Sequence, residues 1–290
     1  FPLATAQNGS HAPPLFRCEE RPMITFDTVS KTYPPDTRAV EDFSLTIAPH
    51  TTTVFLGTSG CGKTTLMRMV NRMVTPTSGT VTVRGQNVAN EDPVALRRSI
   101  GYVLQDGGLF PHRTIVDNIA TVPVLEGVSK ASARADALKL MELVGLDPSM
   151  AKRYPAQLSG GQRQRVGVAR ALANRADILL MDEPFGALDP LVRADLQRQL
   201  RRIQKSLGTT ILFVTHDIDE AILLGDRIVL LREGAQIAQE GTPRDLLLNP
   251  ANDFVREFLG TSAISERERI LEGATGGSQA GKPGTASAND

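Results

Sequence analysis

Apolar and polar positions repeat along the chain with two periods, and these periods predict its secondary structure. Short apolar or alternating runs, which are typical of β-strands, occupy residues 24–29, 44–47, 53–56, 80–84, 100–104, 178–182, 210–215 and 228–232. Apolar residues that recur every three or four positions predict helices over residues 64–73, 132–143, 161–173, 191–207 and 219–224. Because strands and helices alternate, we expect an α/β fold with a largely parallel sheet covered on both faces.

The helix predicted over residues 191–207 has the clearest pattern, with Leu196, Leu200, Ile203 and Leu207 on one side. Its opposite side is basic, a feature shared by solvated helix faces and nucleic acid surfaces. The whole chain has 32 basic and 32 acidic residues, a formal net charge of +0, and no Trp. This balance argues against a protein that coats DNA or RNA, so we interpret the basic side as a solvated face and expect no nucleic acid partner.

Composition also indicates the cellular compartment of the protein and the bounds of its domain. The longest apolar runs have strand length, well below the roughly 20 residues that cross a bilayer. Two cysteines cannot build a disulfide scaffold or a closed zinc site, which favours a reducing, cytosolic compartment. Residues 1–22 are rich in Pro, and residues 273–290 contain no Val, Ile, Leu, Met or aromatic residue. We expect both ends to be disordered, with one domain over residues 23–260 and a tail over 261–290.

A glycine-rich segment lies between the strand predicted over 53–56 and the helix predicted over 64–73. It reads Gly57-Thr58-Ser59-Gly60-Cys61-Gly62-Lys63-Thr64, with Thr65 following, and it matches the phosphate-loop pattern. Glycines let backbone N–H groups approach a phosphate, and the helix N-terminus adds a positive dipole. Lys63 would then reach the β- and γ-phosphates, and the Thr64 hydroxyl would bind Mg²⁺. The alternative, a glycine-rich turn without function, does not explain the flanking strand and helix.

Two acids end the apolar strand predicted over residues 178–182. Asp182 and Glu183 should lie at the carboxyl edge of the sheet, where the phosphate loop also lies. Asp182 suits Mg²⁺ binding through a water molecule, and Glu183 suits orienting and deprotonating an attacking water. An Asp-Glu pair after a strand is common by itself. Following a phosphate loop, it indicates nucleotide hydrolysis.

A second anion-binding helix start occurs at Leu158-Ser159-Gly160-Gly161-Gln162. One nucleotide hardly needs two phosphate cradles from one chain, so we expect the second to serve a nucleotide held by another copy. This pentapeptide is the signature of the ATP-binding-cassette (ABC) ATPases, which the chain resembles over about residues 24–260. The main departure is Thr58, where close relatives usually carry Pro.

The resemblance implies a fold and further site residues. The fold is a P-loop NTPase (RecA-like) parallel-sheet core with an antiparallel β subdomain and a helical subdomain inserted at about residues 106–165. ATP and Mg²⁺ are the implied cofactors. The family stacks an aromatic residue on adenine at the position of Tyr33, and links Mg²⁺ and water through a glutamine at the position of Gln105. Asp189 lies in the loop that crosses the dimer interface, and His216 matches the switch histidine at the γ-phosphate.

The segment around residues 109–114 narrows the class to transport ATPases, in which this region accepts a short helix of the membrane subunit. Residues 71–79, 92–98, 154–155 and 249–260 resemble the glycine betaine and quaternary-amine importers. The implied partners are a second copy, permease subunits and an extracytoplasmic substrate-binding protein, with the chain at the cytoplasmic face of a bacterial membrane. Importers of polyamines, sulfate or methionine remain alternatives, as does a soluble ABC ATPase that acts on DNA or ribosomes.

Overall fold

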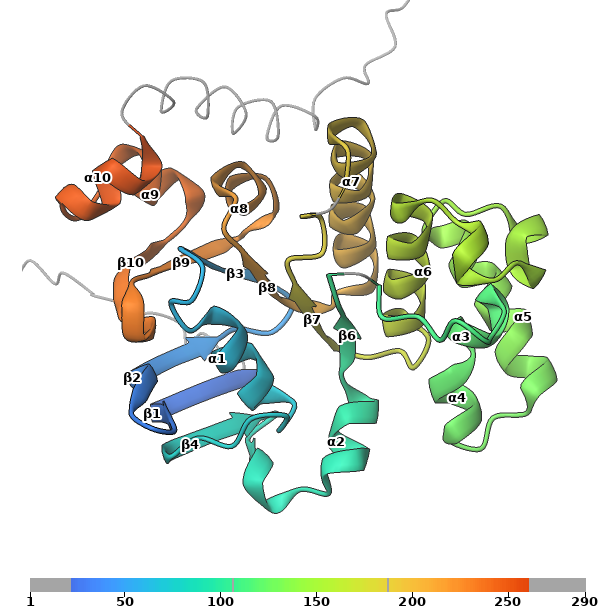
Figure 1. Ribbon diagram of the computed structural model, residues 1–290, viewed down its shortest axis with the longest axis horizontal. Coiled ribbons are helices and arrows are strands. Elements are labelled where there is room, and N and C mark those ends of the chain that lie inside the picture. The colour runs from blue at the N-terminus through green and yellow to red at the C-terminus, as the bar shows by residue number, and fades with distance from the viewer. Residues whose placement is uncertain (1–21, 106, 187, 261–290) are drawn as a thin grey trace, which may run out of the picture.

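The computed structural model describes residues 22–105, 107–186 and 188–260 (Figure 1). The arms predicted over residues 1–22 and 261–290 lie outside the described residues, apart from Pro22. The strands are β1 (Ile24–Tyr33), β2 (Thr37–Ile47), β3 (Thr52–Gly57), β4 (Ser78–Val83), β5 (Gln86–Asn87), β6 (Gly101–Val103), β7 (Ile178–Asp182), β8 (Thr210–Thr215), β9 (Arg227–Leu231) and β10 (Ile237–Gly241).

Helices alternate with these strands through most of the described chain. They are α1 (Lys63–Val70), α2 (Pro93–Ser99), α3 (Ile115–Ile119), α4 (Thr121–Leu125), α5 (Lys130–Leu143), α6 (Gly160–Leu172), α7 (Pro190–Leu207), α8 (Ile218–Leu224), α9 (Pro243–Leu248) and α10 (Asp253–Leu259). Short 3₁₀ turns occupy Val88–Asn90, Pro148–Lys152, Pro155–Gln157 and Glu233–Ala235. Among the described residues, no helix combines the length and apolar character that spanning a bilayer requires.

Two sheets organise the described residues. The central sheet has the strand order β10-β9-β3-β8-β7-β6. Its strands β9, β3, β8, β7 and β6 run parallel, and β10 joins the edge antiparallel to β9. The second sheet, β2-β1-β4-β5, is antiparallel throughout. The prediction of a parallel core with an antiparallel β region is therefore confirmed.

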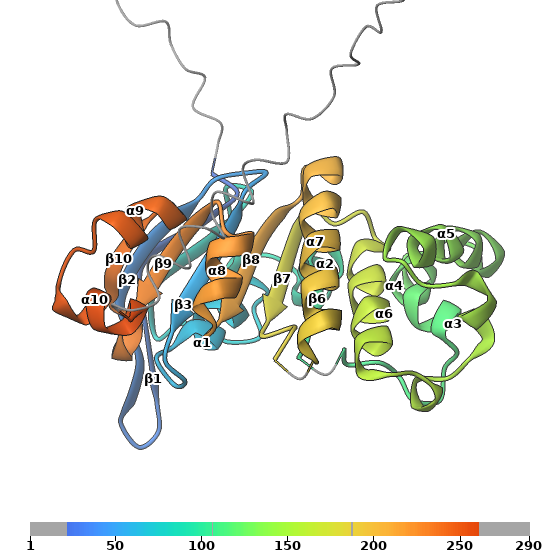
Figure 2. The same cartoon turned by 90° about the horizontal axis from the view of Figure 1, so that it is seen from above.

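Alternate residues of the central strands face two separate apolar clusters, because successive side chains on a strand point to opposite faces. In β8, Ile211 and Phe213 belong to one cluster, while Leu212 and Val214 belong to the other. The first cluster contains side chains of α6, α7 and α8; the second contains those of α1 and of the antiparallel sheet. Helices α6, α7 and α8 thus lie on one side of the sheet, and α1 lies on the other (Figures 1 and 2).

Several predicted elements have different bounds in the structure. The helix predicted over 64–73 ends at Val70, because Asn71 caps it and Arg72 adopts a positive φ of 55°. Leu207, expected on the apolar side of its helix, is exposed at the end of α7. Short elements escaped prediction: α3 and α4 span less than two turns, and the edge strand β10 has no buried position.

Helices α3–α6 lie between β6 and β7 in the chain and form the right-hand part of Figure 1. Arg134 on α5 forms two hydrogen bonds of 2.8 Å with the carboxylate of Asp117 on α3, and this bidentate pair joins the two helices. The pair also lowers the pKa of Asp117, chiefly through the hydrogen bond from Arg134. The helical subdomain predicted at about residues 106–165 falls in this region, although its limits stay a prediction.

Candidate nucleotide-binding site

The predicted phosphate loop connects β3 with α1 at the centre of the parallel sheet. Gly62 occupies the N-cap of α1 with φ 108°, and a Cβ there would lie only 2.4 Å from the Ala39 carbonyl oxygen. A Ser or Asp cap therefore cannot replace it, and no side chain of the described residues caps this helix. The first N–H groups of α1 are left without a side-chain acceptor, an arrangement that favours an anionic ligand.

Lys63 places a buried cation in the same loop. Its ammonium group donates to the carbonyl oxygens of Gly57 at 2.8 Å and Thr58 at 2.6 Å. Lys63 is 4% exposed, and no ion pair among the described residues includes it. The Cys61 sulfur lies 3.7 Å from the same ammonium group. A desolvated cation without a carboxylate partner attracts a negative group strongly. The loop is thus electrostatically suited to a phosphate.

Thr64 and Asp182 meet at the mouth of this loop. The Thr64 hydroxyl donates to Asp182 Oδ1 at 2.8 Å, and Arg68 Nη2 lies 3.7 Å from Asp182 Oδ2. Burial raises the pKa of the Asp182 carboxyl, and the neighbouring Glu183 adds to the rise, whereas Thr64 and Arg68 oppose it. A hydroxyl and one carboxylate suit Mg²⁺, which usually combines one or two carboxylates with phosphate oxygens and water. The residues therefore fit the predicted metal.

Glu183 and His216 lie together beside this pair, although they follow different strands. His216 Nδ1 is 3.2 Å from Glu183 Oε2, and Glu183 has a positive φ of 43° directly after β7. Gln105 occupies the turn after β6, two residues beyond the end of that strand, and its amide lies 3.5 Å from where a Cβ on Gly186 would be. The carboxyl ends of β3, β6, β7 and β8 thus bring most of the predicted catalytic residues to one edge.

The Ser159 segment is organised differently. Ser159 caps α6 by accepting from the Gln162 N–H at 3.2 Å, and the Gln162 side chain accepts from the Ser159 N–H at 3.0 Å. This capping box satisfies both groups within the segment. A Cβ on Gly161 would lie 2.3 Å from Val192 of α7, so this glycine permits close helix packing. Among the described residues, no hydrogen bond or ion pair joins Gly160 or its neighbours to the phosphate loop.

The remaining predicted residues lie at the ends of other elements. Tyr33 ends β1 in the antiparallel sheet, is 37% exposed, and has the Lys31 ammonium 5.1 Å from its ring centroid. Asp189 caps α7 through a hydrogen bond of 3.1 Å from the Val192 N–H. Ala187, which precedes this cap by two residues, lies outside the described residues.

Sequence reasoning missed Arg68, whose guanidinium approaches Asp182. The signal was present, because Arg68 follows Thr64 by four residues and side chains at this spacing share a helix face. Sequence reasoning also missed Asn118, which is fully buried on α3. Its side chain accepts from the Phe110 N–H at 2.7 Å and donates to the carbonyl oxygens of Phe110, Arg113 and Thr114 at 3.0–3.1 Å. The periodic pattern of apolar residues does not predict a buried polar residue of this kind.

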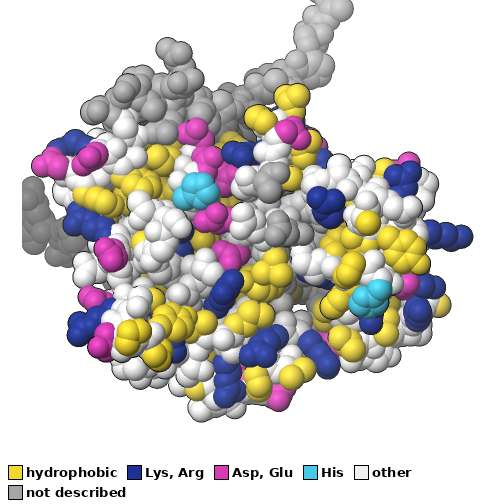
Figure 3. Space-filling view, viewed as in Figure 1, with side chains coloured by type: hydrophobic (Ala, Val, Ile, Leu, Met, Phe, Trp, Pro, Cys, Tyr) yellow, Lys and Arg dark blue, Asp and Glu magenta, His cyan; other side chains and the backbone are white. Residues whose placement is uncertain are grey.

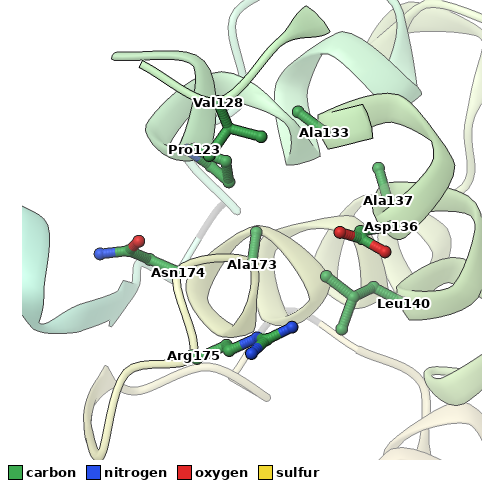
Figure 4. Close-up of a pocket in the computed structure, with 9 residues that line it drawn as sticks. All are labelled: Pro123, Val128, Ala133, Asp136, Ala137, Leu140, Ala173, Asn174 and Arg175. Carbon is green, nitrogen blue, oxygen red and sulfur yellow. The ribbon is translucent and has the colours of Figure 1, made fainter. Parts of the chain in front are cut away.

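A separate pocket of about 220 Å³ lies among the helices between β6 and β7 (Figure 4). Its walls come from α4, α5 and the residues after α6, including Pro123, Leu140 and Arg175. None of the residues predicted to bind nucleotide lines this pocket. It is therefore distinct from the phosphate site.

The fold and this site define the class of P-loop nucleotide-binding proteins. A family model described as "ABC transporter" matches residues 40–186. The chain is 49% identical over 253 residues to the choline transport ATP-binding protein OpuBA of Bacillus subtilis, a match that covers 87% of this chain and 65% of OpuBA. It is 48% identical over 245 residues to the glycine betaine uptake system ATP-binding protein YehX of Escherichia coli, covering 84% and 79%. The chain belongs to the ABC transporter family.

Solved structures of ATP-binding cassettes have the same fold. The dimeric MJ0796 cassette in a post-hydrolysis state with ADP and Pi is 32% identical, with a TM-score of 0.70 over 77% of this chain and 99% of that one. CbiO1 from Clostridium perfringens is 25% identical, with a TM-score of 0.73 over 87% and 98%. The chain spans 65% of the length of OpuBA and 66% of that of the Bacillus subtilis OpuCA protein.

Proposed function

We propose that the chain is the ATP-hydrolysing subunit of a membrane importer and works as a pair of copies. The observation that carries the proposal is the grouping of Lys63, Thr64, Asp182, Glu183 and His216 at one edge of the parallel sheet, with Glu183 and His216 3.2 Å apart. Each member of this group has a separate chemical task. Together they suit transfer of a phosphoryl group to water.

The loop residues 57–65 and the start of α1 bind and orient the phosphates of ATP. Lys63 exchanges its carbonyl partners for phosphate oxygens, and Thr64 with Asp182 holds Mg²⁺, which neutralises charge on the phosphates when bound. Glu183 accepts a proton from the attacking water, and His216 keeps the Glu183 carboxylate oriented and faces the γ-phosphate. Gln105, in the turn after β6, would help to hold the same water and metal, and Tyr33 would stack on the adenine.

The second copy supplies the groups that this edge lacks. The segment Ser159-Gly160-Gly161-Gln162 and the Asp189 loop would each contact a nucleotide bound by the partner. Leu191, next to Asp189, is 84% exposed, an unusual position for a leucine that a partner copy would cover. The dimeric MJ0796 cassettes support this arrangement by analogy. Each ATP would thus lie between Lys63 of one copy and Ser159 of the other.

The membrane subunit would dock on the segment at residues 109–114. In the face of the molecule that Figure 3 shows, apolar side chains gather on the right, over the helices between β6 and β7. Phe110 is 41% exposed in this segment, and the Arg113 guanidinium lies 5.3 Å from its ring centroid. The four hydrogen bonds of Asn118 fix the backbone of the segment, so it can transmit a displacement without deforming. The chain would then lie at the cytoplasmic face of the membrane.

The transported solute would be a quaternary ammonium compound such as choline or glycine betaine. The support comes from the printed functions of OpuBA and YehX, because cargo contacts belong to other chains. A separate extracytoplasmic binding protein would hold the cargo in an aromatic cage, since a quaternary ammonium has no N–H and is held by cation–π attraction.

Reconstitution of the complete transporter in liposomes tests the proposal. We expect ATP hydrolysis to rise when the binding protein and glycine betaine are added together. Phe110→Ala should weaken this stimulation without changing ATP affinity, because the described contacts of Phe110 are with Asn118, His112 and Arg113 and with no residue proposed to bind nucleotide. Stimulation by a polyamine, sulfate or methionine receptor, with no response to any quaternary amine, would refute the cargo and leave the ATPase assignment standing.

A further inference from the structure

Arg193 lies in the first turn of α7, and its guanidinium reaches two loops that precede different helices. Nη2 faces the Leu188 carbonyl oxygen at 3.4 Å, and Nη1 faces Asp217 Oδ2 at 3.3 Å. Leu188 directly precedes Asp189, and Asp217 directly follows His216. One side chain therefore connects the loop proposed to meet the partner copy with the loop proposed to meet the γ-phosphate.

A buried cluster of polar side chains lies next to Arg193 and is hydrogen-bonded to the residues around His216. Glu220 on α8 is 4% exposed; it accepts from the Thr215 hydroxyl at 2.7 Å and from the Gln197 amide at 3.4 Å. Arg193 Nε lies 4.0 Å from Glu220 Oε1. Burial raises the pKa of the Glu220 carboxyl, and the charge of Asp217 adds to the rise. Thr215 and Asp217 flank His216, so the backbone on both sides of the histidine is tied to this cluster.

The distances from the Arg193 guanidinium to its three acceptors could each become shorter. The hydrogen bonds to Leu188 and Asp217 are at the long end of the normal range, and Nε is buried with no hydrogen-bond partner among the described residues. Leaving such a donor unpaired is costly. A small approach of the two loops would give Nε the Glu220 oxygen and shorten the other two contacts.

The geometry points to Arg193 as a positioning residue that couples the Asp189 loop to the His216 loop. This inference rests on the proposed function, because it assumes that the partner copy presses on Asp189 when ATP closes the dimer. Closure then tightens the Arg193 contacts and fixes His216 beside Glu183. The described contacts of Arg193 are with Leu188, Asp217 and Glu220, none of which is proposed to bind phosphate, so its removal should spare ATP binding and impair the step that follows.

The test compares Arg193→Met with Arg198→Met in the purified full chain. Met keeps the apolar stem of Arg but has no N–H donor. Arg198 is a matched control because it lies on the same helix with its side chain 63% exposed, paired to Asp195 at 3.4 Å. We expect Arg193→Met to lower kcat roughly 10-fold, the effect of losing a charge-assisted hydrogen bond, and to bring the Hill coefficient for ATP close to about 1. Monomer ATP affinity should stay within about twofold, and Arg198→Met should change none of these values.

Two further measurements separate coupling from stability. Arg193→Lys should recover part of the lost kcat, because an ammonium can still reach one of the acceptors. The chain has no Trp, so Leu191→Trp places a single indole beside the Asp189 loop. ATP should change the fluorescence of this indole when residue 193 is Arg and change it much less in the Arg193→Met variant, although ATP is bound in both.

Wild-type kcat and Hill coefficient in Arg193→Met would overturn the inference. So would a parallel fall of Tm, ATP affinity and kcat without rescue by Lys, since this is the signature of a structural role. If Arg193→Met does not fold, Asp217→Asn keeps the helix cap and weakens the ion pair, and unchanged kcat and Hill coefficient there would also overturn it. Failure of the unmodified chain to hydrolyse ATP would instead refute the proposed function, and the inference with it.

Discussion

The carboxyl edge of the central sheet and the start of α6 are both proposed to contact phosphate, but the donor groups of the two regions differ in their hydrogen bonding. At the sheet edge, Gly62 leaves the first N–H groups of α1 without a side-chain cap, and the described partners of Lys63 are two carbonyl oxygens and the Cys61 sulfur. At the start of α6, Ser159 and Gln162 cap each other fully. The residues of the first site all come from one chain and converge at one sheet edge. The second is satisfied as it stands, and its donors become available only to a group that displaces or joins the cap.

Under the proposed function, this difference would let one site bind nucleotide alone while the other acts only in an assembly. A cap that is already satisfied gains little from a free phosphate in water, because the phosphate must compete with an internal hydrogen bond. A phosphate that Lys63 of another copy already holds does not have to be bound by the Ser159 segment alone, so this competition matters less. The predictions below separate the two regions, from the largest expected effect to the smallest.

Glu183→Gln should leave the sheet edge able to bind ATP while removing the base. We expect hydrolysis to fall on the order of 10²-fold or more, because general-base catalysis contributes at least that much. ATP should still bind and hold two copies together, and size-exclusion chromatography with ATP will detect this dimer. Hydrolysis close to that of the unmodified chain would remove Glu183 from the proposed role.

Ser159→Arg and Lys63→Ala should each abolish hydrolysis and should complement each other when mixed. In a head-to-tail dimer the mixed pair carries both defects at one site and leaves the other intact, so part of the hydrolysis returns. Ser159→Arg alone should bind ATP as a monomer with unchanged affinity, measurable by titration with a fluorescent ATP analogue. Loss of monomer affinity in this variant would show that Ser159 contacts the nucleotide of its own chain.

Gly62→Ala should weaken ATP binding by roughly 10-fold or more. The φ of 108° and the approach to the Ala39 carbonyl leave no place for a Cβ, and such strain costs on the order of 1–3 kcal/mol. Thr58→Ala is the matched control in the same loop, because its side chain is exposed while its carbonyl oxygen holds Lys63. Its ATP affinity should stay within about twofold, and equal losses in both variants would contradict the backbone argument.

Ser159→Ala should cost about 1 kcal/mol in the free energy of unfolding, the usual value of an N-cap. Ser129→Ala is its matched control, because Ser129 caps α5 in the same manner by accepting from the Ser132 N–H. Denaturant melts should show similar losses for both. ATP-driven dimerisation should weaken in Ser159→Ala alone, and equal dimerisation would indicate that the Ser159 hydroxyl is only a cap.

The sequence predicted those parts of the fold in which a period persists over several residues. The predicted bounds of β7 and β8 agree with the structure to the residue, because each strand is a short apolar run that polar residues delimit. The short helices α3 and α4 were missed, since five residues cannot display a helical period.

The residues of the candidate site also fall into those that a sequence pattern predicts and those that it does not. Motif spacing located Lys63, Asp182 and His216 on their elements, whose common edge follows from a parallel sheet. The motifs do not include Arg68, although its spacing of four residues from Thr64 could have found it. They do not reveal Asn118, which binds backbone groups that no motif describes, or Arg193, which contacts residues on other elements. Their roles depend on tertiary distances, which a pattern along one chain does not contain.

The two apolar clusters on opposite sides of the central sheet have a mechanical consequence. The loops that carry Ser159, Asp189 and Asp217 all lead into helices of the same layer, α6, α7 and α8, whereas Lys63 begins α1 in the other. A small shear of the first layer against the sheet would move these loops relative to Lys63 and leave the phosphate loop in place. The central sheet thus separates the helices whose loops are proposed to face a partner copy from the helix that begins at Lys63.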